Sequence, residues 1–419
     1  MTYQINSNLT SNRAKTSFQA MEWEDRYGAH NYHPLPVVLD RGKGLELWDI
    51  EGKKYFDFLS AYSAVNQGHC HPKIVGAMVE QAQKLTLTSR AFYNSRLGEF
   101  EKLITELLGY EKVLAMNSGA EANETALKLA RKWAYQVKGI PNNKAKIIAV
   151  SNNFHGRTLG VISASTEASS TEGFGPFIEG FEIIPYNDLV ALETALQDPN
   201  VCAFWVEPIQ GEAGVIIPDY GYLSKSKVLC DKYKVLLMVD EVQTGMCRTG
   251  KMLACDHEMV RPDVLILGKA LSGGTMPVSA VLADDEIMMT IKPGEHGSTF
   301  GGNPVACAVG IASLQVLVEE NLADNAHRMG KIFRTRMEEI KLKTPMVRTV
   351  RGKGLLNAVE IEPTNGITAW EVCLELKKNG LLAKPTRQDT IRFAPPLIIS
   401  ESQMLECCHI IEESIINIL

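Results

Sequence analysis

Two side chains that could carry chemistry each follow a stretch typical of a buried strand. Asp240 comes directly after the apolar run 235–239, and Lys269 comes shortly after the run 264–267. Open α/β sheets bind their ligands at the carboxyl ends of parallel strands, so both residues could face one site. Burial there would lower the pKa of the lysine and make a neutral amine available. The alternatives are a helix-capping carboxylate and a surface lysine.

A third segment, residues 117–121, lies between a predicted strand and a predicted helix. The backbone N–H groups at a helix N-terminus form an anion site, Ser118 adds a hydroxyl, and Gly119 allows a close approach of the backbone. The alternative is a plain helix cap with Glu121 in the first turn. Together with an acid and a lysine at strand ends, a phosphate site would supply what pyridoxal phosphate needs.

Two other motifs are weak. Residues 245–251 fit the G-x-x-x-x-G-K pattern, but Met252 occupies the position where a P-loop requires Ser or Thr for magnesium. His69, Cys70 and His71 are too few and too close together to indicate a metal site, so we expect no metal.

The elements that must position these residues alternate along the middle of the chain. Apolar runs predict strands at residues 112–116, 145–150, 201–206, 235–239, 264–267 and 278–282. Helical patterns lie between several of them, including 121–137 with an apolar face. This rhythm predicts an α/β fold with a largely parallel sheet covered by helices on both faces.

The two ends of the chain differ from the middle. Residues 45–59 are typical of a hairpin turning at Gly52, and residues 72–85 of a helix with proline in its first turn. A long helical run follows residue 306, then strands, a helix, a strand at 391–393 and a final helix from Ser400. We expect an N-terminal arm and small-domain segment (1–70), a large α/β domain (71–305) and a C-terminal α+β domain (306–419).

The composition of the chain argues against a nucleic-acid-binding protein and against a membrane protein. Hydrophobic residues make up 45% and charged residues 22%, as in ordinary soluble globular proteins. The net charge of −6 argues against nucleic acid as a partner. No apolar run approaches the ~18 residues that span a bilayer, so no membrane partner is expected. Nine irregularly spaced cysteines indicate reduced, mostly buried thiols.

The N-terminal 20 residues are rich in Ser, Thr and Asn and contain Arg13 and Lys15. This composition faintly resembles a mitochondrial transit peptide. Because there are only two basic residues and no amphipathic pattern, we expect a short disordered or swapped arm. The predicted location is therefore the cytoplasm, with the mitochondrial matrix as the alternative.

Longer segments add to these separate features. The chain contains YGAHNYHPLPVVLDRGKG, FLSAYSAVNQGHCHPKI, LTSRAFYN, FHGRTLG, VEPIQGEAGV, DEVQTG, LGKALSGG, KPGEHGSTFGGNP and RGKGLL. From about Tyr27 to the C-terminus the sequence resembles the class III pyridoxal-phosphate aminotransferases, and within them enzymes that act on ornithine. The resemblance implies fold type I and a homodimer with shared active sites.

The resemblance also implies roles for residues that bind pyridoxal 5'-phosphate. Lys269 would bind the cofactor covalently and carry the proton between substrate and cofactor. Asp240 would pair with the pyridine nitrogen, Phe154 would stack on the ring and Gln243 would reach the ring hydroxyl. The phosphate would be held by Ser118, Gly119 and Ala120, and by Ser298 and Thr299 of the neighbouring subunit.

The implied reaction converts L-ornithine and 2-oxoglutarate to glutamate-5-semialdehyde and L-glutamate, a step of arginine and proline metabolism. Arg157 would hold the ornithine α-carboxylate, a bidentate task suited to a guanidinium. Tyr32 would bind the α-amino group, and Tyr62 would line the pocket. Arg392 would bind the α-carboxylate of glutamate or 2-oxoglutarate. Glu212 would neutralise Arg392 while ornithine reacts, then move away.

The sequence is also compatible with other activities. N-acetylornithine or 4-aminobutyrate could be the amino donor, and these substrates have no free α-amino group for Tyr32 to bind. An aminomutase or racemase on the same fold, or a scaffold protein without activity, would also share the pattern. Ala120 and His155 occupy positions where other family members carry different residues. His155 could tune the pocket or be an ordinary, partly buried histidine.

Overall fold

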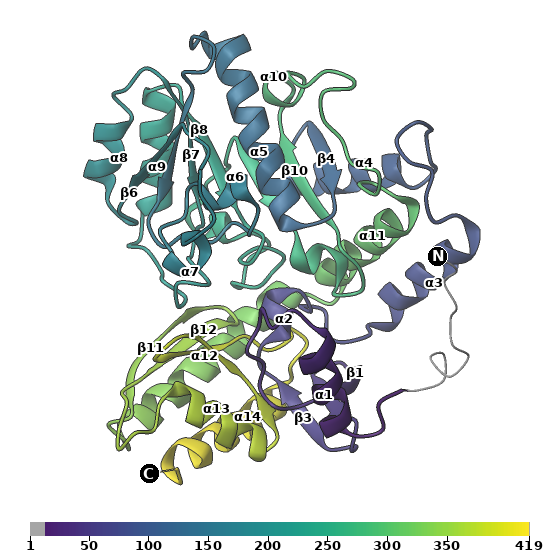
Figure 1. The fold of residues 1–419 in the computed structure, drawn as a ribbon, viewed down its shortest axis with the longest axis vertical. Coiled ribbons are helices and arrows are strands. Elements are labelled where there is room, and N and C mark those ends of the chain that lie inside the picture. Colours follow the sequence, from purple (N-terminus) through teal and green to yellow (C-terminus); the bar gives the residue numbers. More distant parts are fainter. Residues whose placement is uncertain (1–12, 419) are drawn as a thin grey trace.

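The computed structural model describes residues 13–418, which form three sheets surrounded by helices. Figure 1 shows a large sheet with its helices in one half, and the N- and C-terminal segments packed together in the other half. The large sheet has seven strands in the order β4-β10-β9-β8-β7-β5-β6. Their bounds are β4 (Lys112–Met116), β5 (Lys146–Val150), β6 (Phe181–Ile184), β7 (Val201–Val206), β8 (Leu236–Asp240), β9 (Val264–Leu267) and β10 (Ser279–Ala283).

The central strands are apolar on both faces because helices cover both faces. Every residue of β7, β8, β9 and β10 is buried. Alternate residues of β8, such as Leu236 and Met238, pack with α5 (Gly119–Trp133), whereas Leu237 and Val239 belong to the core on the opposite face. That second core includes α9 (Tyr222–Lys232), α4 (Leu97–Leu108) and α11 (Pro304–Glu319).

Two four-stranded sheets form the other half of the molecule. Segments from the N-terminal and C-terminal parts of the chain share the first sheet. In it β13 (Leu381–Leu382) pairs in parallel with β3 (Lys54–Asp57), beside β2 (Glu46–Asp49) and β1 (Leu39–Lys43). The second sheet has the order β11-β12-β15-β14. Its strands are β11 (Val347–Lys353), β12 (Leu356–Ile361), β14 (Lys384–Arg387) and β15 (Thr390–Phe393), and its helices are α12 (Leu322–Lys341), α13 (Ala369–Lys378) and α14 (Glu401–Ile416).

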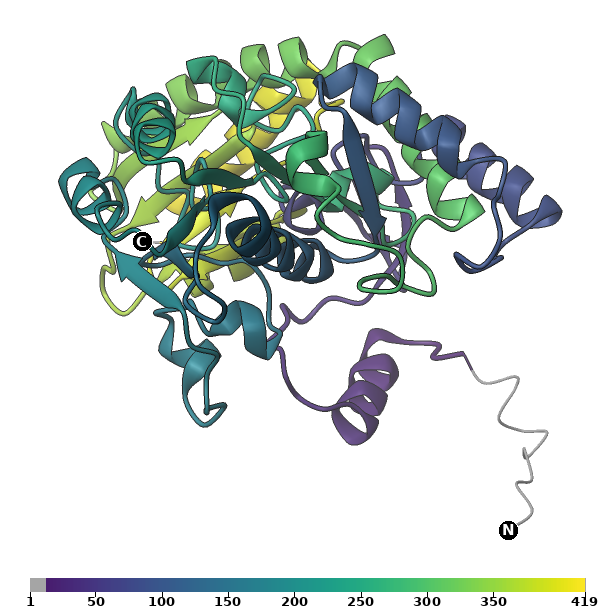
Figure 2. The ribbon, with the colours of Figure 1, turned by 90° about the horizontal axis from the view of Figure 1, so that it is seen from above.

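The remaining α-helices lie elsewhere along the chain. They are α1 (Ser17–Tyr27), α2 (Ser60–Ser63), α3 (Pro72–Lys84), α6 (Leu159–Ile162), α7 (Ala168–Thr171), α8 (Leu189–Ala195) and α10 (Asp285–Met288). Figure 2 shows α1 standing away from the body of the molecule, and none of its side chains is buried.

The predicted strands of the large sheet are confirmed, with bounds within one residue. The predicted hairpin is formed by β2 and β3, and the predicted helices are α3, α5 and α14. The long run after residue 306 is two helices, α11 and α12, because Asn321 adopts a left-handed backbone with φ of 51° and the chain bends by 60°. Eight of the nine cysteines are buried free thiols, and Cys70 is exposed.

The described residues include only part of the predicted N-terminal arm. Residues 1–12 of the predicted arm lie outside the described residues. Residues 17–20 are not disordered, because they begin α1, where the side chain of Thr16 accepts a hydrogen bond from the N–H of Gln19. The other form of the expectation, a swapped arm, stays a prediction. Within residues 13–418 no single helix is long and apolar enough to cross a membrane; α11 and α12 would suffice only as a bent pair.

Candidate active site

Asp240 and Lys269 both lie at the carboxyl ends of adjacent strands in the centre of the large sheet. Asp240 ends β8, Lys269 follows β9, and the parallel pairing sets Asp240 opposite Ile266. Lys269 starts a short 3₁₀ turn with a φ of 44°. Burial lowers the pKa of Lys269, and the negative charge of Glu212 opposes this shift only in part. The arrangement therefore provides a lysine that loses its proton more readily than a solvated one.

The carboxylate of Asp240 is buried and accepts three hydrogen bonds. Its Oδ2 accepts from Nδ1 of His155 at 2.7 Å and from Nδ2 of Asn123 at 2.9 Å. Its Oδ1 accepts from the backbone N–H of Val242 at 2.9 Å. Both carboxylate oxygens of this buried side chain therefore have hydrogen-bond donors, which fix its orientation.

The predicted anion site is the N-terminus of α5. Ser118 caps the helix, and its hydroxyl and the carboxylate of Glu121 form a capping box. No hydrogen bond within the described residues engages the backbone N–H groups of Gly119 and Ala120. A Cβ on Gly119 would come within 2.9 Å of the Val242 side chain. Glycine is therefore needed for the helix to approach the loop that follows Asp240.

These groups fit pyridoxal phosphate. Free N–H donors suit its phosphate, a buried carboxylate suits its pyridine nitrogen, and a lysine of lowered pKa suits its aldehyde. The half-buried ring of Phe154 lies in the loop after β5, and its backbone N–H donates to the carboxylate of Glu207 at 3.0 Å. Burial and the charge of Asp240 raise the pKa of Glu207 well above its usual range.

A second charged cluster lies at the junction of the two halves. Nη1 of Arg392, in β15, donates to Oε1 of Glu212 at 2.7 Å and to Oε1 of Gln243 at 3.0 Å. Nε2 of Gln243 donates to Oε1 of Glu212 at 2.9 Å. Burial opposes ionisation of Glu212, but the charges of Arg392 and Lys269 prevail and lower its pKa to about 2. Gln243 thus contacts the charged pair, and its predicted role at the cofactor ring stays a prediction.

Aromatic and basic side chains surround this cluster. The ring of Tyr62 lies 4.8 Å from the guanidinium of Arg392, and Tyr62 adopts a left-handed backbone with φ of 60°. A cleft of about 170 Å³ is lined by Phe154, Arg157 and Glu212, among others. Arg157 is exposed and donates to the hydroxyl of Ser170.

Three predicted residues lie at the periphery of this arrangement. Tyr32 is 74% exposed, although it lies close enough to affect the pKa of Tyr62. Burial, Glu212 and Tyr32 raise that pKa, and the charge of Arg392 opposes them. Ser298 accepts a hydrogen bond from Nδ2 of Asn117 of its own chain at 2.8 Å, and Thr299 is exposed. Contacts of Ser298 and Thr299 across a dimer stay predictions.

Sequence reasoning missed several polar residues of the site. Asn123 is buried on the apolar face of α5, and Glu207 directly follows β7. A polar residue inside an apolar helical face and a carboxylate at a strand end are the signals that could have identified them. Trp205 was counted only as part of a strand, but its Nε1 donates to Oδ1 of Asn123 at 3.0 Å.

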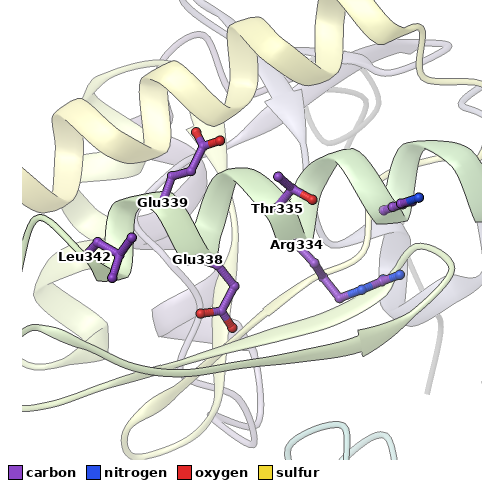
Figure 3. Close-up of a pocket in the computed structure, with 6 residues that line it drawn as sticks. Arg334, Thr335, Glu338, Glu339 and Leu342 are labelled. Atoms are coloured by element: carbon purple, nitrogen blue, oxygen red, sulfur yellow. The ribbon is translucent and has the colours of Figure 1, made fainter.

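Other candidate sites lie away from this edge. His69 contacts Asp57 and His71 contacts Glu320, so the two histidines have different acidic partners. Within residues 13–418 no cluster of three metal-ligating side chains is found. A surface groove of about 500 Å³ lies along α12 and is lined by none of the predicted site residues. Figure 3 shows residues that line it, among them Arg334.

Comparison with known proteins decides the family. Residues 27–415 match the aminotransferase class-III family. The chain belongs to the class III aminotransferases. It is 63% identical to the mitochondrial ornithine aminotransferase of Rattus norvegicus over 396 residues, which cover 94% of this chain and 90% of the relative. The predicted family and the predicted enzyme class are confirmed.

Solved structures confirm the fold. The chain is similar to an ornithine aminotransferase from Toxoplasma gondii, with a TM-score of 0.96, 48% identity and coverage of 100% and 99% of the two chains. It is also similar to an acetylornithine aminotransferase from Elizabethkingia anophelis, with a TM-score of 0.89, 59% identity and coverage of 96% and 100%. Class III aminotransferases use pyridoxal phosphate, which confirms the predicted cofactor and the fold type I architecture.

The Glu212–Arg392 ion pair predicts a pH-dependent stability. The folded-state pKa of Glu212, about 2, lies below its ordinary value of 4.5. Its stabilisation is therefore complete above 4.5 and is lost as the pH falls from 4.5 toward 2. We expect the free energy of unfolding of the wild type, relative to the variant Arg392→Met/Glu212→Gln, to fall by roughly 1 kcal/mol between about pH 7 and about pH 4. Urea unfolding at both pH values measures this difference.

The single variant Arg392→Met provides the control. It leaves a buried carboxylate without its main partner, so it should be less stable near pH 7 than the double variant. A wild-type advantage of the same size at both pH values would contradict the lowered pKa of Glu212.

Proposed function

We propose that this aminotransferase moves the δ-amino group of L-ornithine to 2-oxoglutarate, giving glutamate-5-semialdehyde and L-glutamate. The observation that carries the proposal is the 2.7 Å ion pair between Arg392 and Glu212 beside the cleft that includes Arg157. Two substrates of different charge must use one pocket, and an arginine whose charge is neutralised by a movable carboxylate can serve both.

In the first half-reaction Glu212 keeps Arg392 neutralised. The guanidinium of Arg157 then binds the only carboxylate of ornithine, and the hydroxyl of Tyr32 binds the α-amino group. This orientation leaves the terminal amine, and not the α-amine, directed to the strand ends. The ring of Tyr62 against Arg392 keeps water from the guanidinium.

In the second half-reaction the substrate has two carboxylates. Glu212 moves away from Arg392, which binds the α-carboxylate of 2-oxoglutarate, and Arg157 binds the other. Pyridoxal phosphate, when bound, carries the amino group between the substrates and spreads the negative charge left on the substrate carbon. Nζ of Lys269 takes the proton from the reacting carbon of ornithine in the first half-reaction and delivers a proton to the carbonyl carbon of 2-oxoglutarate in the second, a task that its lowered pKa suits.

The names of relatives support the same substrate. Proteins from Rattus norvegicus, Drosophila melanogaster and Plasmodium falciparum, named as ornithine aminotransferases, are 63%, 62% and 55% identical to this chain. Ornithine transamination belongs to arginine and proline metabolism. The Elizabethkingia anophelis structure, 59% identical, is named for acetylornithine and keeps that substrate as the alternative.

The active unit that we propose is a homodimer with shared sites. In support, none of the side chains of α1 is buried and Tyr93 is 99% exposed, so both segments have surface for a second chain to cover. Ser298 and Thr299 would reach the partner's phosphate site. We also propose the domain division 1–70, 71–305 and 306–419, although α11, which starts near the second boundary, packs against α3 and α4.

The cellular compartment is a separate question. Relatives from Rattus, Drosophila and Caenorhabditis carry "mitochondrial" in their names. These names fit the alternative location, the mitochondrial matrix, and lend no support to the predicted cytoplasmic location.

The visible absorbance of the holoenzyme tests the substrate pair. Adding L-ornithine should remove the absorbance band of the cofactor-bound enzyme, and 2-oxoglutarate should restore it, because each substrate drives one half-reaction. N-acetylornithine and 4-aminobutyrate serve as comparison donors. If only N-acetylornithine removes the band, the amino donor is N-acetylornithine and the proposal for ornithine is wrong.

Tyr32 should discriminate between amino donors. The variant Tyr32→Phe removes one hydrogen bond to a charged amine, so kcat/KM for ornithine should fall by about tenfold. The value for N-acetylornithine should not change, because that substrate has no free α-amino group. Tyr220→Phe, an exposed tyrosine outside this cleft, is the matched control. An equal loss for both donors would contradict the role of Tyr32.

A further inference from the structure

Four buried side chains form a closed circuit behind the candidate cofactor site. Nε1 of Trp205 donates to Oδ1 of Asn123 at 3.0 Å, and Nδ2 of Asn123 donates to Oδ2 of Asp240 at 2.9 Å. Nδ1 of His155 donates to the same Oδ2 at 2.7 Å. The imidazole of His155 closes the circuit by stacking on the indole of Trp205, with ring centres 3.8 Å apart and planes within 19°.

The circuit joins four parts of the large sheet. Trp205 comes from β7, Asn123 from α5, Asp240 from the end of β8, and His155 from the loop after β5. All four are buried, and His155 is 3% exposed. Because four separate elements fix its members, the circuit holds the carboxylate of Asp240 in one orientation.

Within the described part of the chain, only one of the two ring nitrogens of His155 has a hydrogen-bond partner. Its Nε2 is buried and has no hydrogen-bond partner. A proton on Nε2 would be a buried donor without an acceptor, which is costly. A proton on Nδ1 is therefore favoured over one on Nε2, because only Nδ1 faces an acceptor, Oδ2 of Asp240.

Counting acceptor sites on Asp240 shows what the circuit leaves available. An ionised carboxylate offers about four lone-pair sites. Oδ2 uses both of its sites, for His155 and Asn123, and Oδ1 uses one for the N–H of Val242. One site on Oδ1 remains for a further donor.

We propose that His155 is a positioning residue that, together with Asn123, saturates Oδ2 of Asp240 and reserves Oδ1 for the protonated pyridine nitrogen of the cofactor. The proposal rests on the placement of the cofactor ring beside Asp240 in the proposed function. Without the Nδ1–H donor, Oδ2 would have a free acceptor site, and the carboxylate would lose both orientation and stabilisation of its charge.

Affinity for the cofactor tests this role without measuring turnover. His155→Phe removes the donor and keeps an aromatic ring against Trp205, whereas His155→Asn keeps an N–H donor at nearly the same position. The dissociation constant of pyridoxal phosphate from the apoenzyme should rise roughly 10- to 100-fold in His155→Phe. It should stay close to the wild-type value in His155→Asn. If His155→Phe does not fold, His155→Leu replaces it.

A cofactor analogue separates positioning from a purely structural role. In 1-deazapyridoxal phosphate a C–H group replaces the ring nitrogen, so Asp240 has no N–H to accept. His155→Phe should weaken binding of pyridoxal phosphate and leave binding of the analogue unchanged. An equal loss of affinity for both compounds, or no loss for either, would overturn the proposal.

Asp240→Asn serves as the reference variant. It should weaken binding of pyridoxal phosphate more than binding of the analogue. If it does not discriminate, the ring nitrogen does not face Asp240, and the cofactor placement itself is wrong. If it discriminates and His155→Phe does not, the placement stands and only the role of His155 is overturned.

Discussion

A sheet whose two faces are both buried leaves only the ends of its strands for polar chemistry. In β7, β8 and β9 every side chain except that of the last residue of β8, Asp240, is apolar and buried, so a charged residue in the middle of these strands would be costly. Charged groups can therefore stand only where the strands end. Asp240 and Lys269 occupy two such ends, and the N-terminus of α5 opens at the same edge. The position of the site is thus a consequence of how the core excludes charge.

Charge balance then determines what each group can do. Lys269 and Arg392 together lower the pKa of Glu212, while burial lowers the pKa of Lys269. Glu207 lies in the same environment with a single hydrogen bond and a raised pKa. The charges of Arg392 and Lys269 thus favour the ionised form of Glu212, whereas burial favours the neutral form of Glu207. This division lets the site hold several ionisable groups close together without a large excess of one charge.

The sequence predicted those parts of the structure that have a local signal. Fully apolar runs located β7 and β9, and the last helix was predicted to start at Ser400, which is its N-terminal cap in the structure. These patterns depend on near neighbours in the chain. β6 was missed because it is an edge strand with partly exposed residues and so has no continuous apolar run. β13, with two residues, is defined only by its pairing with β3, more than 300 positions away.

The same limit applies to the site. The sequence placed Asp240 and Lys269 at strand ends, but it could not show that Asn123 and Trp205 reach the carboxylate of Asp240. Those contacts depend on the packing of α5 over the sheet, which no spacing in the chain reveals. Family resemblance supplied the assignments of Arg392 and Glu212, which lie 180 residues apart and form the ion pair that the proposed reaction requires.

The most direct test of the account is to identify the lysine that holds the cofactor. The holoenzyme is reduced with borohydride, which fixes the cofactor to its lysine, and the digested protein is mapped by mass spectrometry. We expect the added mass of the cofactor on the peptide that contains Lys269. The same mass on a different lysine, with Lys269 unmodified, would contradict it.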